Sequence, residues 1–184
     1  EKRLDSSVFK IGLIGYTNAG KSTIMNALTN KSQYEADELF ATLDATTKSV
    51  NLTGRFNVTV TDTVGFIQDL PTELISSFKS TLEESKNVDL LVHVIDASDP
   101  NHEEHEKTVL AIMKDLDMLD IPRLTLYNKA DKAENFTPTL TPYVLISAKN
   151  ENSRAILQNA LLNKMRELFV PFRIRVSPSK AYKL

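Results

Sequence analysis

GYTNAGKST, residues 15–23, matches the phosphate-loop pattern G-x-x-x-x-G-K-[ST] at every fixed position. An apolar run of strand length, residues 8–14, precedes it, and a helix start, residues 23–28, follows it. A strand, a glycine-containing turn and a helix N-terminus in this order form a cradle for polyphosphate, because backbone N–H groups and the helix dipole face the anion. The stretch therefore predicts a phosphate site, with a chance match in a glycine-containing loop as the alternative for this motif alone.

Two side chains at the end of this motif have separate expected roles. Lys21 is expected to reach the β- and γ-phosphates of a nucleotide, and Ser22 to place its hydroxyl on Mg²⁺. The glycines at both ends let the backbone approach the β-phosphate with no Cβ in the way. The predicted nucleotide-binding residues of this stretch are Gly15, Tyr16, Thr17, Asn18, Ala19, Gly20, Lys21, Ser22 and Thr23.

The composition is that of an ordinary globular domain. At 184 residues the chain can bury a sizeable core, and its net charge of −2 shows no basic excess that would point to nucleic acid. The absence of cysteine rules out disulfides and thiolate zinc sites and suits a cytoplasmic protein. No apolar run is long enough to span a membrane, and residues 1–9 lack the apolar core of a signal peptide.

The chain starts without methionine, on EKRLDSS, and we therefore expect a piece of a longer protein. Residues 1–7 are expected to be a linker or the end of a preceding domain, residues 8–169 the main domain, and residues 170–184 a C-terminal tail. The tail contains two prolines and the alternating run RIRV. A frayed terminus, an extra edge strand and the start of a further module all remain open for it.

Strand and helix patterns alternate along residues 8–169, which predicts an α/β fold with a mostly parallel sheet. Further strands are expected at 47–52 and 56–61, as a hairpin, and at 89–96, 121–127 and 143–146, with helices at 71–85, 102–119 and 153–169. The helix between 131 and 147 should be short or absent, because this stretch contains two prolines. The predicted inward residues of the last two helices are Val109, Ile112, Met113, Leu116, Ile156, Leu157, Ala160, Leu161, Met165 and Leu168.

Three further motifs also follow predicted strands, where open α/β sheets bind ligands. Asp62, Thr63, Val64 and Gly65 have the D-x-x-G spacing, in which the carboxylate helps to hold Mg²⁺, usually through water, and the glycine N–H meets the γ-phosphate. This motif is weak alone, because Asp and Gly are common turn residues.

The motif Asn128, Lys129, Ala130 and Asp131 is more specific. The Asp131 carboxylate can accept hydrogen bonds from the N1–H and N2–H₂ groups of guanine, whereas adenine has no donor at N1. A polar surface turn is the alternative for this tetrapeptide. The third motif, Ser147, Ala148 and Lys149, would place a backbone N–H on the guanine O6 and is nearly uninformative alone.

Together and in this order, the motifs resemble those of a translation-factor-class GTPase. YTNAGKST, LFATLDATT, DTVGFIQDLP, TLEE and HVIDASDP look like the GTPase domain of the HflX family, in the Obg-related group, over roughly residues 8–169. The resemblance implies a P-loop GTPase fold, with about six strands, one of them antiparallel, and helices on both faces. It also implies Mg²⁺-dependent hydrolysis of GTP to GDP and phosphate, and a conformational switch that acts on the ribosome, mainly on its large subunit. We expect the protein to be a monomer.

The resemblance assigns the switch loop. It places Phe40, Ala41, Thr42, Leu43 and Asp44 at the nucleotide, and it gives the contact to γ-phosphate and Mg²⁺ to Thr42. The residues alone do not rank Thr42 above Thr46 or Thr47. Ala45 departs from the proline that relatives commonly have. The expected catalytic residues are thus Lys21, Thr42 and Gly65, and the expected metal residues are Ser22, Thr42 and, through water, Asp62.

Several alternatives remain open. A nucleotide-gated binding module with negligible hydrolysis is one, and a P-loop kinase or ATPase is another, which Asp131 disfavours. Phe66 stands where Ras-like switches place the glutamine that orients water, so turnover should be slow unless Gln68 takes that role. Asn18 could ligate K⁺ beside the phosphates or only stabilise its own turn. The three histidines have structural interpretations, because no cysteine or carboxylate frames a metal site around them.

Overall fold

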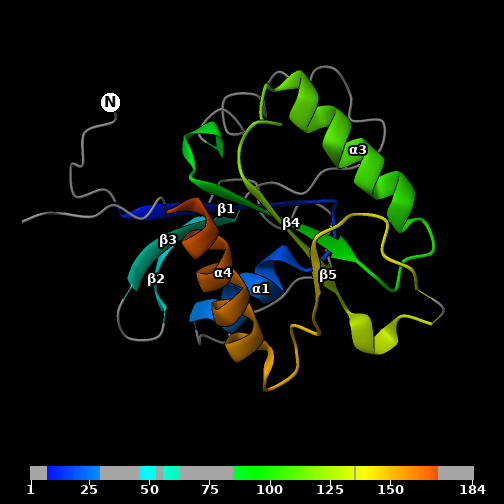
Figure 1. Ribbon diagram of the computed structural model, residues 1–184. Helices are drawn as coiled ribbons and strands as arrows, with labels where there is room; N and C mark the ends of the chain where they lie inside the picture. Colours follow the sequence, from blue (N-terminus) through cyan, green and yellow to red (C-terminus); the bar gives the residue numbers. More distant parts are fainter. Residues whose placement is uncertain (1–7, 30–45, 53–55, 63–84, 135, 170–184) are drawn as a thin grey trace, which may run out of the picture.

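The computed structural model describes residues 8–29, 46–52, 56–62, 85–134 and 136–169 (Figure 1). Its elements, in chain order, are β1 (Phe9–Gly15), α1 (Lys21–Thr29), β2 (Thr46–Leu52), β3 (Phe56–Asp62), η1 (Ser85–Asn87), β4 (Leu90–Asp96), α3 (His102–Asp115), β5 (Arg123–Asn128), η2 (Ala130–Lys132), β6 (Tyr143–Leu145) and α4 (Ser153–Leu168). The helix predicted at 71–85 lies, apart from its last residue, outside the described residues. No helix in the described part of the chain is long and apolar enough to cross a membrane.

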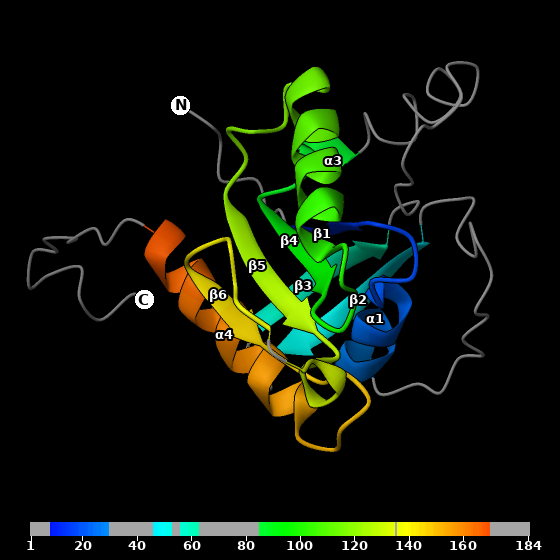
Figure 2. The same cartoon turned by 90° about the vertical axis from the view of Figure 1, so that its right-hand side faces the viewer.

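The six strands form one sheet in the order β2-β3-β1-β4-β5-β6. Only β2 runs antiparallel to its neighbour, as the hairpin prediction required, and the other pairs are parallel (Figure 2). The apolar run of β4 is buried from Leu90 to Ile95, as a strand covered on both faces must be. The predicted mostly parallel sheet with one antiparallel strand is therefore confirmed.

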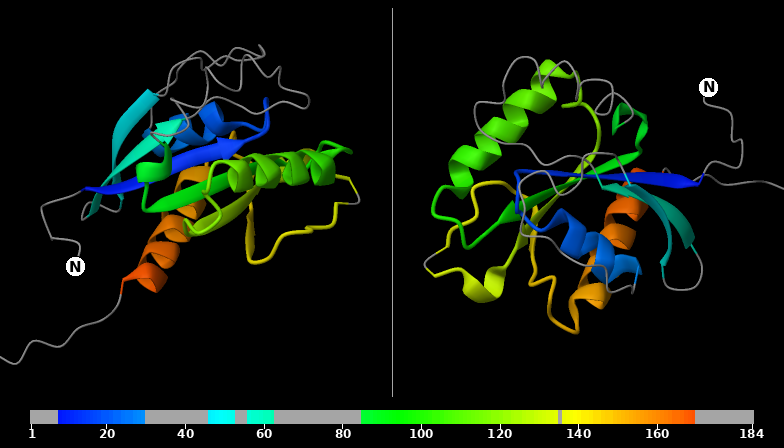
Figure 3. Two further views of the ribbon diagram at one scale, coloured as in Figure 1. Left: turned by 90° about the horizontal axis from the view of Figure 1, so that it is seen from above. Right: turned by 180° about the vertical axis from the view of Figure 1, so that it is seen from behind.

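Helices cover both faces of this sheet, as predicted. α1 and α4 pack on one face, where Leu13 and Val92 of the strands share a hydrophobic core with Leu157 and Leu161 of α4. α3 packs on the opposite face, where Ile14 and Leu91 meet Val109 and Met113 (Figures 1 and 3). Neighbouring strand residues thus enter different cores, because side chains alternate along a strand.

Two helix ends differ from the prediction by two residues or more. α1 begins at Lys21, two positions before Thr23, because the phosphate loop runs directly into its first turn and the Ile24 N–H already bonds to the Gly20 carbonyl at 2.9 Å. α3 ends at Asp115 instead of 119, because Asp117 adopts the left-handed conformation, with φ 53°. The Met118 N–H then bonds back to the Met113 carbonyl and closes the helix.

The inward stripe of α4 was also predicted partly wrongly. Ile156 is 42% exposed, whereas Leu162, which the prediction omitted, is buried. Buried positions recur at Leu157, Leu161 and Met165, four residues apart, so the apolar face is rotated away from Ile156. The short-or-absent helix after 131 is confirmed for the described residues, because only η2 precedes β6 there.

Candidate nucleotide-binding site

One buried side chain joins three of the predicted motifs. Asn128 stands at the carboxyl end of β5 and is 2% exposed. Its Nδ2 donates to the Ala19 carbonyl of the phosphate loop at 3.1 Å, and its Oδ1 accepts from the Ala148 N–H at 3.0 Å. The motifs that follow β1, β5 and β6 therefore meet at one edge of the sheet, as the strand-end rule predicts.

The phosphate loop admits only glycine at both of its fixed glycine positions. A Cβ on Gly15 would lie 2.4 Å from the Val94 carbonyl oxygen. Gly20 has φ +99°, and its Cβ would lie 2.2 Å from the Asn128 Nδ2. The loop therefore packs tightly against β4 and β5, and α1 starts directly behind it, with its N-terminal N–H groups available to an anion.

Lys21, Ser22 and Asp62 lie together at the start of α1 and the end of β3. The Ser22 hydroxyl donates to the Asp62 Oδ2 at 2.9 Å. Burial lowers the pKa of Lys21, and the Asp62 carboxylate offsets this only in part. A polyphosphate would compensate the buried cation. The hydroxyl and carboxylate oxygens are hard ligands of the kind that Mg²⁺ prefers, so the residues fit the expected ion.

The base-recognition motif continues from Asn128 into η2. The Asp131 N–H donates to the Ser147 hydroxyl at 3.0 Å, and the Ala130 N–H donates to the Ile146 carbonyl at 3.1 Å. A hydrogen bond with Ser147 is also the main cause that holds the pKa of the Asp131 carboxyl below its usual value. Asp131 is thus an ionised, exposed acceptor beside the predicted guanine loop.

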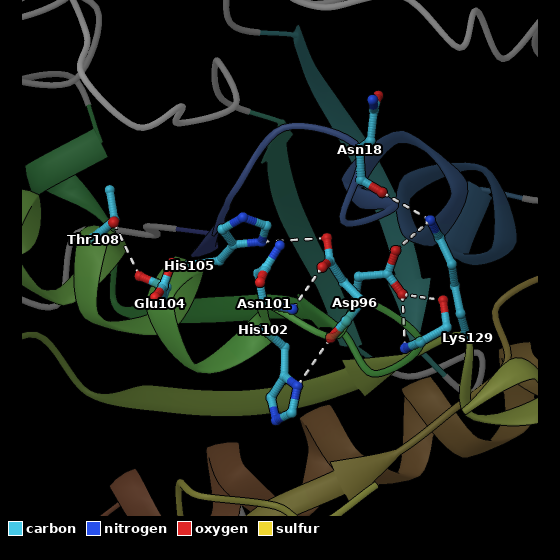
Figure 4. Close-up of polar contacts among 10 residues, drawn as sticks. Asn18, Asp96, Asn101, His102, Glu104, His105, Thr108 and Lys129 are labelled. Atoms are coloured by element: carbon cyan, nitrogen blue, oxygen red, sulfur yellow. Dashed lines mark hydrogen bonds and ion pairs between the residues drawn. The ribbon is translucent and has the colours of Figure 1, made fainter. Parts of the chain in front are cut away.

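The side chain of Lys129, in the same motif, contacts the phosphate loop. It adopts a left-handed conformation, with φ 58°, and its Nζ donates to the Asn18 carbonyl at 3.0 Å and to the Asp96 Oδ2 at 2.6 Å (Figure 4). Asn18 has the same backbone handedness, with φ 62°. This edge of the sheet thus combines the N-terminus of α1, two lysines and an exposed carboxylate, which together suit a nucleotide.

Residues 10–129 match the family model of 50S ribosome-binding GTPases. This chain belongs to that family.

Curated relatives support the resemblance to HflX. The chain is 47% identical over 175 residues to the GTPase HflX of Alkalihalophilus pseudofirmus, which covers 94% of the chain and 41% of that protein. It is 44% identical over 169 residues to the GTPase HflX of Caldanaerobacter subterraneus, covering 92% of the chain and 39% of the relative. The predicted resemblance is confirmed, and the chain spans about two fifths of the length of these relatives.

Solved structures support the fold. A GTP-binding protein from Sulfolobus solfataricus, solved in complex with GDP, superposes with a TM-score of 0.69 at 24% identity, over 88% of this chain and 53% of that protein. The predicted P-loop GTPase fold is therefore confirmed, and this likeness carries no more than the fold.

Part of the predicted site lies outside the described residues. These positions are Phe40, Ala41, Thr42, Leu43, Asp44, Ala45, Thr63, Val64, Gly65, Phe66 and Gln68, whose roles stay predictions. Of the alternatives to Thr42, Thr47 lies in β2 with its hydroxyl 2.8 Å from that of Thr61. In the described part of the chain, no group of three or more His, Cys, Asp or Glu residues could hold a metal.

The sequence did not indicate two contacts at or beside the phosphate loop. The Tyr16 ring stacks on His105 of α3, with centroids 3.7 Å apart and planes at 6°, so its side chain faces α3. Asp96 forms an ion pair with Lys129, although none of the predicted motifs gives this aspartate a role. Its position directly after a buried strand, beside the phosphate loop, was the signal that could have found it.

Proposed function

We propose that this GTPase domain binds GTP and GDP with Mg²⁺ and hydrolyses GTP to GDP and phosphate. The observation that carries the proposal is the junction at Asn128, which brings the phosphate loop and both base-recognition motifs to one edge of the sheet. The nucleotide would extend from Asp131, at the guanine, to Lys21 and Ser22, at the phosphates. In the cell the domain would act as a cytoplasmic switch on the large ribosomal subunit, the class of partner named in its family.

The chemistry asked of the residues is mainly positioning and charge compensation. Lys21 and the phosphate-loop N–H groups would hold the β- and γ-phosphates. Ser22 and, through water, Asp62 would hold Mg²⁺, which would supply positive charge at the phosphates. Thr42 would contact the metal and γ-phosphate, and the Gly65 N–H the γ-phosphate. Ordering of these two segments by the γ-phosphate would make the domain a switch.

Base selectivity tests the proposal most directly. Wild type should bind GTP and GDP and discriminate strongly against ATP. Asp131→Asn should weaken GTP binding roughly 100-fold or more, because two hydrogen bonds to a charged acceptor are lost. The same variant should gain affinity for xanthosine triphosphate, whose altered edge complements an amide. Competition against a fluorescent nucleotide measures the affinities for GTP, ATP and xanthosine triphosphate. Tight ATP binding by wild type would reject the proposal.

Hydrolysis separates the enzyme from a binding module that holds nucleotide without turnover. Single-turnover hydrolysis of labelled GTP should be slow and should fall further in Thr42→Ala, while GDP affinity stays unchanged. Stimulation is measured by adding purified large ribosomal subunits to the same reaction. Failure to hydrolyse GTP, alone or with subunits, would leave the binding module.

We propose K⁺ as a second cation at the phosphates. No arginine lies between Thr29 and Lys48 to supply positive charge from the switch loop. The Asn18 side chain is exposed, and it points away from the contact that its own carbonyl makes with Lys129 (Figure 4). GTP hydrolysis should be faster in KCl than in NaCl at equal ionic strength, and Asn18→Ala should abolish the difference. Equal rates for wild type in both salts would exclude this role.

A further inference from the structure

Asp96 is the last residue of β4, and one of its two carboxylate oxygens is held by hydrogen bonds from Ser98. The Ser98 N–H and hydroxyl both donate to its Oδ1, at 2.9 and 2.6 Å, in a turn that closes on the aspartate. The Oδ2 is thereby aimed at the Lys129 Nζ, 2.6 Å away (Figure 4). The two strand ends are also joined, because Asp96 pairs with Asn128 in the sheet and the Ala97 N–H donates to the Asn128 carbonyl at 2.8 Å.

The Lys129 side chain is therefore held in one position. It follows a buried asparagine, its backbone is left-handed, and its ammonium group lies between a carboxylate and the phosphate-loop carbonyl of Asn18. A lysine side chain loses much conformational entropy when it is held in one position. A fixed, charged acceptor compensates for this loss before any ligand arrives, because bonds between ionised groups are about twice as strong as neutral ones.

We propose that Asp96 is a positioning residue for nucleotide retention: it holds Lys129 on the phosphate loop and thereby slows release of GDP. This inference rests on the proposed function, because it assumes that the site binds a guanine nucleotide. Asp96 touches no part of the nucleotide in this assignment. It acts through Lys129, which ties the base-recognition motif to the loop that holds the phosphates, so that neither can open alone.

Release of a fluorescent GDP analogue, chased with excess GDP, measures this role. Asp96→Asn keeps the side-chain shape and the acceptor for Ser98 but removes the charge. It should release the analogue about tenfold faster, the size expected for losing one partly exposed charge-assisted hydrogen bond. Single-turnover hydrolysis of bound GTP should change little, because the proposed function assigns the γ-phosphate to Lys21, Thr42 and Gly65 and not to Lys129. Asp96→Glu, which restores the charge, should recover part of the slow release.

A double-mutant cycle separates positioning from a structural role. In a Lys129→Ala background, Asp96→Asn should add almost nothing to the release rate, because its partner is already gone. Asp89→Asn is the matched control at the other end of β4, where its Oδ2 accepts from the Lys10 N–H at 2.9 Å. It removes the same charge from the residue directly before the same strand and should leave release unchanged.

The outcomes are distinct. The inference is overturned if Asp96→Asn releases the analogue at the wild-type rate. It is also overturned if Asp96→Asn accelerates release equally in the wild-type and the Lys129→Ala background. In either case, tight binding of the analogue by wild type leaves the proposed function standing. Failure of wild type to bind the analogue rejects the proposed function itself. Thermal unfolding of each variant shows whether Asp96→Asn causes a general loss of structure. If it does, release from Asp96→Glu and the double-mutant cycle still test whether Asp96 positions Lys129.

Discussion

At the scale of single residues, His93 shows how a titratable group is used for structure. It lies in β4 and is 1% exposed, as its predicted place in a buried strand requires. Burial, aided by the Arg123 cation, lowers its pKa from 6.5 to about 3. Its Nδ1 has no hydrogen-bond partner within the described part of the chain. The imidazole is therefore neutral in the folded domain and takes up a proton readily only after unfolding.

This difference predicts a pH dependence of stability. The folded pKa lies below the unfolded one, so the stabilisation is complete above pH 6.5 and is lost as the pH falls toward about 3. In that window, one proton taken up on unfolding lowers the free energy of unfolding by up to about 1.4 kcal/mol per pH unit. Urea unfolding of wild type and His93→Gln between pH 7 and 4.5 measures this, and the variant should show the shallower slope. Parallel slopes would mean that His93 does not carry the effect.

At the scale of elements, the phosphate loop is built on two backbone positions that tolerate no side chain. Gly20→Ala would strain a backbone with φ +99° and place a methyl group against Asn128, which has no room to move without losing both of its bonds. We expect a loss of about 1–3 kcal/mol from the backbone alone. Nucleotide binding should be lost as well, because the loop can no longer close on the phosphates.

Gly12→Ala in β1 is the matched control for this change. The added Cβ would meet the ends of the Leu91 and Val88 side chains at 3.2 and 3.3 Å, which can shift by a few tenths of an ångström. This variant should be mildly destabilised and still bind nucleotide. Denaturant unfolding and nucleotide titration of both variants make the comparison. Retained binding in Gly20→Ala would refute the tight-loop explanation.

The elements also show what the sequence could predict. The strands were predicted to within two residues at each end, because apolar runs are local signals. The end of α3 was missed, because the left-handed Asp117 is not a glycine, and Ile156 was misplaced, because periodicity does not fix the rotation of a helix to within one residue. The strand-end position of Asp96 could have marked it as a site residue, but its partner Lys129 is far away in sequence, so no local pattern could indicate the contact itself.

At the scale of the whole molecule, the sheet connects stability to ligand binding. The candidate site is made from loops that follow different strands, and Asn128 bonds to two of these loops from the end of a third strand. A nucleotide that contacts all of them should therefore stabilise the domain as one unit. Ligand at 100 times its dissociation constant adds about 2.7 kcal/mol to the free energy of unfolding.

Asn128→Ala should lower both the stability of the free domain and its stabilisation by nucleotide. It leaves the Ala19 carbonyl and the Ala148 N–H buried without this partner, at a cost of roughly 2 kcal/mol or more. At about 2–4 °C per kcal/mol, Tm should fall by at least about 4 °C, and the rise in Tm with Mg²⁺ and GDP should shrink. Asn51→Ala, which removes an exposed 2.7 Å bond to Asn57 in the β2–β3 hairpin, is the control and should keep the full rise. Thermal scans across a GDP series test this, and an undiminished rise in Asn128→Ala would show that the loops bind nucleotide without being tied to one another.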